Sequence, residues 1–168
     1  MSTEQDALSS QHLTFRLEGE LFAVEVAKVR EVLDLVPITK VPRAPNYMRG
    51  MINVRGKVVP VVDLHVKFGM PPAVNSRDTR IIVLEVEVLG EQLVVGAIAD
   101  AVHEVTELEP GAVEAVPRIG MHWNTEFMKG IGKRHEHFVI LLDVNRVFSV
   151  DEVVEVKDVF DEALPAGH

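Results

Sequence analysis

The chain has 168 residues, no cysteine and a formal net charge of −9. The missing cysteines exclude a disulfide framework, a thiolate metal site and a cysteine nucleophile. The negative charge argues against general nucleic-acid binding and against anionic membrane surfaces, since both need a basic surface. No apolar run approaches the ~20 residues that cross a bilayer, and the polar, acidic start lacks a signal region. We therefore expect a cytoplasmic protein with no direct membrane insertion and no nucleic-acid partner.

The first periodic segments predict a β-hairpin followed by another strand. Residues 13–26, LTFRLEGELFAVEV, alternate between apolar and polar residues on both sides of a Glu-Gly turn. The next segment, KVREVLDL at 28–35, places Val29, Glu31 and Leu33 on one face of an extended strand. A buried strand rarely carries this many charges, so we expect one face to be accessible to solvent. A contact surface and an ordinary amphipathic strand both fit the pattern.

A second hairpin is expected in GMINVRGKVVPVVDL, residues 50–64. Arg55-Gly56 lies between two apolar runs, and Gly56 supplies the positive φ that a tight turn requires. Pro60 cannot donate a hydrogen bond to a sheet, so it belongs at an edge or a bulge. An arginine at the tip fits either a solubilising charge or a rigidly held donor for a partner carboxylate.

The chain contains an internal duplication. Residues 47–68 align with residues 127–148 without a gap at an offset of 80. Five pairs are identical, namely Met48/Met128, Gly50/Gly130, Val59/Val139, Asp63/Asp143 and Phe68/Phe148. Upstream, residues 19–35 resemble residues 90–108, with Val29, Glu31, Val32 and Leu35 falling on Val102, Glu104, Val105 and Leu108. Each copy therefore has about five short strands, which suggests a small barrel rather than an open sheet.

The remaining segments connect and flank these copies. Asp63 and Asp143 end the repeated hairpins, and we expect each to cap a short helical turn. Residues 69–79, GMPPAVNSRDT, read as a linker because they hold paired prolines and polar residues. Residues 149–168 have apolar residues at roughly helical spacing, which predicts a C-terminal helix packed on a barrel; a ragged tail is the alternative. We expect residues 1–11 to be disordered.

The second hairpin resembles the signature of the CheW family, the adaptor proteins of bacterial chemotaxis. The family pattern is matched at Gly50, Asn53, Val54, Arg55, Gly56, Val58, Val59, Pro60, Val61, Val62, Asp63 and Leu64. The resemblance extends to FAVEVAKVREVL upstream and to NTEFMKGIG and VILLDV downstream, and so covers about residues 12–148.

The resemblance implies a mostly β fold of two intertwined five-stranded SH3-like barrels with short helices. With the repeat, it places the first barrel at about residues 19–78 and the second at about 79–148 together with the N-terminal strand 12–18. It also implies no catalysis and no cofactor. Such adaptors couple the cytoplasmic tip of a chemoreceptor to the regulatory domain of the histidine kinase CheA, in arrays associated with the membrane.

The same resemblance implies which residues contact partners. Receptor and kinase binding is expected at Val29, Glu31, Val32, Gly50, Arg55, Arg80 and Val105. A second kinase contact is expected at Glu114 and Ile119, although some relatives carry a basic residue at the position of Glu114.

Three other interpretations of the sequence compete with an adaptor. A small β-barrel could bind a transition metal through His122, His135 and His137, since two of these histidines share one face of an extended segment. KGIGK, residues 129–133, superficially resembles a phosphate loop, but it lacks the full pattern and reads as a turn. A related scaffold serving a signalling array other than chemotaxis is the nearest alternative, and the sequence does not separate it from the adaptor.

Overall fold

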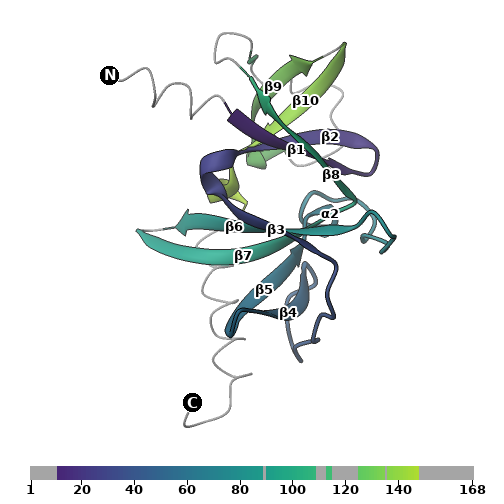
Figure 1. Ribbon diagram of the computed structural model, residues 1–168, viewed down its shortest axis with the longest axis vertical. Helices are drawn as coiled ribbons and strands as arrows, with labels where there is room; N and C mark the ends of the chain where they lie inside the picture. Colours follow the sequence, from purple (N-terminus) through teal and green to yellow (C-terminus); the bar gives the residue numbers. More distant parts are fainter. Residues whose placement is uncertain (1–10, 89, 109–112, 115–124, 135, 148–168) are drawn as a thin grey trace.

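The computed structural model describes residues 11–88, 90–108, 113–114, 125–134 and 136–147 (Figure 1). These residues form two curled five-stranded sheets and little helix. Sheet 1 has the strand order β8(Ala101–Glu107), β1(Gln11–Leu17), β2(Glu20–Glu25), β10(His137–Leu142), β9(Met128–Arg134). Sheet 2 has the order β3(Val29–Asp34), β6(Arg80–Val88), β7(Glu91–Ala99), β5(Lys57–Asp63), β4(Met48–Val54). The mostly β duplication expected from the sequence is confirmed.

The two copies exchange their first hairpins. Sheet 1 combines β1 and β2 of the first copy with β8, β9 and β10 of the second, and sheet 2 combines β6 and β7 of the second with β3, β4 and β5 of the first. Parallel pairs, β2 with β10 and β5 with β7, join the exchanged hairpin to its host. This differs from the expected division, which placed residues 20–25 in the first barrel and residues 80–99 in the second. The repeat identifies equivalent strands but does not determine which copy supplies a strand's neighbour.

The pairing registers of the two sheets follow the repeat. Gly50 lies opposite Val61, and their equivalents Gly130 and Leu141 lie opposite each other. Isolated bridges, Thr39 with Met51 and Glu114 with Ile131, bring the chain after β3 and β8 back against β4 and β9. Each bridge thus adds a crossing segment to one edge strand of its sheet. Figure 1 shows sheet 1 as the upper half of the molecule and sheet 2 as the lower half.

Most of the core lies between the two sheets rather than inside either one. Four rings run through it, with centroid distances of 6.0 Å from Phe15 to Phe22, 5.9 Å from Phe22 to Phe68 and 5.4 Å from Phe68 to Phe127. Each sheet also encloses a smaller cluster, around Val61 and Ile98 in sheet 2 and around Ala23, Val139 and Leu141 in sheet 1. The inter-sheet burial is the reason why the barrels form one unit.

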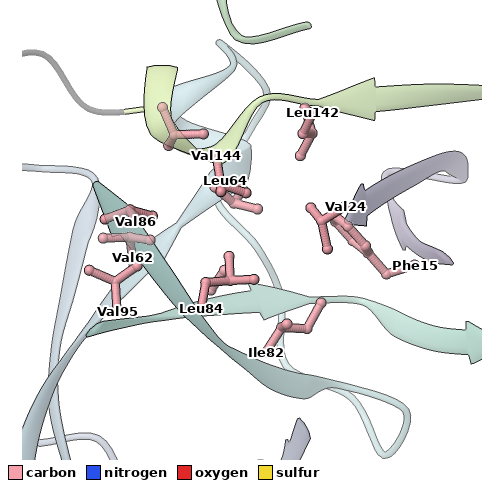
Figure 2. A pocket seen from close by; sticks show the side chains of 12 residues that line it. Phe15, Val24, Val62, Leu64, Ile82, Leu84, Val86, Val95, Leu142 and Val144 are labelled. Carbon is pink, nitrogen blue, oxygen red and sulfur yellow. The ribbon is translucent and has the colours of Figure 1, made fainter. Parts of the chain in front are cut away.

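A small apolar cavity lies within this inter-sheet core. Figure 2 shows Phe15 and Val24 from sheet 1 facing Ile82 and Leu84 from sheet 2, with Leu64 close by. Its volume is about 10 Å³, close to the least that one water molecule occupies, and every lining residue is apolar. It is a packing defect of the core and offers no ligand site.

Short helical turns follow the last strand of each copy. Asp63 accepts a hydrogen bond from the His65 N–H at the start of α2(Leu64–Lys67), at 2.9 Å. Asp143 accepts one from the Asn145 N–H at the start of η4(Val144–Arg146), at 3.1 Å. The predicted caps are therefore confirmed. Two further turns, η1(Val26–Lys28) and η3(Thr125–Phe127), precede β3 and β9.

Several expectations are corrected or fall outside the described residues. KGIGK is not a turn, because residues 129–133 lie inside strand β9. Gln11 was expected in a disordered N-terminus but belongs to β1, and residues 1–10 lie outside the described residues. The predicted C-terminal helix at 149–168 lies outside the residues described. None of the helices in the described ranges is long and apolar enough to span a membrane.

Candidate functional site

The β4–β5 hairpin ends in a tight turn with Arg55 at its tip. Arg55 and Gly56 have φ angles of 50° and 84°, so both central residues adopt the positive φ of a type I′ turn. The Asn53 side chain braces this turn by accepting a hydrogen bond from the Gly56 N–H at 2.8 Å. The Arg55 side chain is 79% exposed. The turn therefore presents a cation to solvent on a backbone with little freedom.

Glu31 of β3 fixes the direction of the Arg55 side chain. Nη1 of Arg55 donates to Oε2 of Glu31 at 2.9 Å, and Nη2 donates to Oε1 at 3.0 Å. This two-bond fork uses two of the five guanidinium N–H groups and leaves three for a partner. The two residues were expected on one partner surface, and the structure brings them together. Glu31 acts on Arg55 rather than offering a free carboxylate.

Strand β3 has the two faces expected of it. Val29, Glu31 and Leu33 are half-buried, whereas the intervening residues are exposed, including Val32 at 39%. Arg80 on the neighbouring strand β6 pairs with exposed Asp34 at 3.3 Å. An apolar side chain among charged ones is a mixture found at protein contact surfaces.

Gly50 has a structural role that the sequence did not reveal. It is buried, its φ is +147°, and a Cβ atom built on it would lie 2.2 Å from the Thr39 backbone oxygen. Its repeat equivalent Gly130 is equally crowded, since a Cβ there would lie 2.5 Å from Val113 and 2.9 Å from the Glu114 oxygen. Both glycines allow a connecting segment to cross closely over the strand.

The other expected contact residues that the structure describes lie on or beside sheet 1, away from the Arg55 turn in the topology. Val105 on β8 is 53% exposed and pairs with Leu13 of β1. Glu114 is exposed and bridges Ile131 through two backbone hydrogen bonds of 2.8 Å. Ile119 lies outside the described residues. The candidate surface on sheet 1 is thus separate from the one around Arg55.

Two exposed apolar residues were missed in the sequence. Val58 on β5 is 43% exposed and Phe138 on β10 is 68% exposed. They are repeat equivalents at the offset of 80, as Val32 and Val105 are in the upstream alignment. Both copies therefore expose an apolar pair at matching positions. The repeat alignment could have signalled this, had it been combined with the outward alternation of each strand.

The metal-binding alternative gains no support from the described residues. No three histidine, aspartate or glutamate side chains within the described ranges gather as metal ligands would. His137 lies in β10 beside the expected hairpin tip, where Glu136 has a φ of 68°. His122 and His135 lie outside the described residues.

Comparison with known proteins decides the family. A family model for the CheW-like domain matches residues 11–158. The chain belongs to the CheW-like family. The family consists of non-enzymatic scaffolds.

The similarity to named relatives and to a solved structure extends over nearly the whole chain. The chain is 29% identical to the chemotaxis protein CheW of Klebsiella aerogenes, covering 92% of this chain and 90% of that protein. It is 32% identical to a probable chemotaxis protein CheW of Rhizobium etli, covering 83% and 88%. The crystal structure of the scaffolding protein TtCheW from Thermoanaerobacter tengcongensis superposes with a TM-score of 0.75 at 35% identity, covering 86% and 95%.

Proposed function

We propose that this protein is a non-enzymatic adaptor that couples chemoreceptor tips to the regulatory domain of a CheA-type histidine kinase. Family membership and relatives named as chemotaxis proteins support this role. The observation that carries it is Arg55, which stands 79% exposed at a braced turn while Glu31 fixes its direction. Holding a long cation in one orientation lowers the entropy lost when a partner carboxylate binds it. The protein would act in the cytoplasm, recruited to membrane-associated receptor arrays.

The partner surfaces are proposed to be shared between the two sheets. Val29, Glu31, Val32, Arg55 and Arg80 would form the surface on sheet 2. Val105 and Glu114 would add contacts at sheet 1, and Glu114 together with Ile119 would serve a second kinase contact. Exposure of Val32 and Val105 supports both assignments.

The adaptor role is tested by titration calorimetry of the purified chain with the regulatory domain of its cognate kinase. We expect micromolar binding, weakened about tenfold or more by Arg55→Glu, which corresponds to about 1.4 kcal/mol. Arg77→Glu, an equal charge change at an exposed residue of the 69–79 segment, is the matched control and should bind as the unaltered chain does. Unchanged kinase activation by folded Arg55→Glu protein would refute the role of Arg55.

A second comparison separates the surfaces. Ile119→Asp is expected to weaken assembly with the kinase more than binding to a receptor tip, and equal losses would count against that division. No binding to a folded kinase domain at all would point to a scaffold serving a different signalling array.

A further inference from the structure

The helical turns α2 and η4 each hold the tip of a hairpin that belongs to the opposite sheet. In η4, which follows sheet 1, Oδ1 of Asn145 accepts a hydrogen bond from the Glu87 N–H of sheet 2 at 2.9 Å. In α2, which follows sheet 2, the repeat equivalent of Asn145 is His65. His65 reaches the β1–β2 tip of sheet 1 through Asp100, whose Oδ2 accepts from the Glu18 N–H at 2.8 Å. Each contact therefore links an exchanged hairpin to the sheet that holds the other three strands of its own copy.

The neighbours of His65 require a specific protonation state. The side chain is 4% exposed, Nε2 lies 3.0 Å from Oδ1 of Asp100, and Nδ1 lies 3.2 Å from the Pro71 carbonyl oxygen. A carbonyl oxygen and a carboxylate are both acceptors, so each ring nitrogen must carry a hydrogen for both bonds to form. A neutral imidazole has one N–H and would leave one of these bonds unmade. Asn145 has no titratable proton, so its contact is free of this requirement.

We infer that His65, Asp100 and the Glu18 N–H form a protonation-dependent latch between the two sheets, and that Asn145 with the Glu87 N–H is its pH-independent counterpart. Asp100 is well placed to transmit the change, because it lies on the β7–β8 connection and its own N–H donates to the Arg16 oxygen at 3.0 Å. Loss of the His65 proton leaves one ring N–H for two acceptors, so the bond to Asp100 then competes with the bond to Pro71. The adaptor's two candidate surfaces lie on different sheets, so the latch would influence the orientation of one surface relative to the other.

The two acceptor oxygens that face the His65 ring determine whether a rise in pH strengthens or weakens the latch. Hydrogen bonds link His65 to two carboxylates: the ring bonds Asp100, and the backbone N–H donates to Asp63, which is itself paired with Arg49. Lys67 of the same turn lies over the Tyr47 and Phe127 rings. The latch is complete when both ring nitrogens carry a hydrogen, so its stabilisation is lost when a rise in pH removes one of these hydrogens.

Amide hydrogen exchange and nitrogen NMR on the intact chain test this inference. We expect ¹⁵N shifts that show both ring nitrogens of His65 protonated at low pH. When the pH is raised until the ring loses one of its two hydrogens, the protection factor of the Glu18 amide should fall about tenfold, the effect expected of one bond to a charged group. The Glu87 amide in the same sample should show no such fall, which makes it an internal control.

Variants separate the latch from general effects of pH. His65→Gln keeps one side-chain donor but cannot titrate, so it should remove the pH dependence of Glu18 protection. A neutral His65 ring at every pH, or parallel changes at Glu18 and Glu87, would overturn the inference. The unaltered chain supplies both readouts, so the test stands even where a variant does not fold.

Discussion

Replacing Gly50 by alanine distinguishes a structural role from a partner contact at this position. The new Cβ atom would lie 2.2 Å from the Thr39 oxygen and 2.8 Å from the Ile38 side chain, so the crossing segment must move. That movement would break the Thr39 N–H bond to Met51 and the Met51 N–H bond to Thr39, of 2.9 Å and 2.8 Å.

The expected loss in free energy of unfolding follows from these contacts. Two backbone hydrogen bonds contribute about 1 kcal/mol each. The positive φ adds roughly 1–2 kcal/mol for an L-residue. We therefore expect Gly50→Ala to destabilise the fold by roughly 3–4 kcal/mol, which for a chain of this size lowers Tm by roughly 6–16 °C.

The assay is urea and thermal denaturation beside a matched control. Gly69→Ala also places alanine at a positive φ of +83°, but a Cβ there meets nothing within 4 Å. It should lower the free energy of unfolding only by the strain of the positive φ, roughly 1–2 kcal/mol. If Gly50→Ala were no less stable than Gly69→Ala and yet lost partner binding, the steric reasoning would be wrong and Gly50 would be a contact residue.

Further substitutions test stability at pairs of buried and more exposed positions, and test the contribution of Glu31 to kinase binding. Asp63→Ala should cost about 3 kcal/mol or more in urea denaturation, because fully buried Asp63 also binds Arg49 and the Ala73 N–H. Asp143→Ala, which removes a part-exposed cap, should cost about 1 kcal/mol, and equal losses would contradict this asymmetry. Phe22→Ala should cost about 3–5 kcal/mol because the ring is fully buried between its neighbours; Phe138→Ala at an exposed site should stay within about 0.5 kcal/mol. Glu31→Gln should change stability by at most about 1 kcal/mol and still weaken kinase binding measured by calorimetry; unaltered binding would show that the fork to Arg55 is dispensable.

Local features were predictable from the sequence because local chemistry determines them. Gly56 after Arg55 marks a tight turn, and an aspartate before a helical turn marks a cap, wherever these residues occur in a fold. Pro60 illustrates the same point: β5 pairs with β4 on one side, but its pairing with β7 begins only at Val61. The proline therefore lies where the strand has no second neighbour, as its missing N–H requires.

Long-range pairings were not predictable in the same way. Nothing in the sequence around Glu31 indicates that Arg55 will be its partner, since the two residues meet only through the curl of sheet 2. Similarly, Gly50 reads as part of a family motif, and its crowding by Thr39 becomes visible only with the crossing segment in place. Asp100 lies in the connection between two strands, so its link to His65 also depends on the exchange of hairpins.

The exchange itself predicts that neither copy can fold alone. A chain divided after Val74, which is 83% exposed in the linker, gives two fragments that each hold two strands of one sheet and three of the other. In the first fragment β3 loses β6 and β5 loses β7, and the phenylalanine core loses Phe127. Isolated two-stranded units are marginal in water, so we expect each separate fragment to be unfolded by circular dichroism at low concentration.

Mixing the fragments restores every strand pair, so we expect a 1:1 complex with the spectrum of the intact chain. The cut in an exposed segment removes no hydrogen bond of either sheet. A first fragment that folds as a monomer would instead show that β1 and β2 can pair with β3, β4 and β5 of their own copy. In that case each barrel would be self-sufficient, and the contacts of His65 and Asn145 across the sheets would be consequences of the exchange rather than requirements for it.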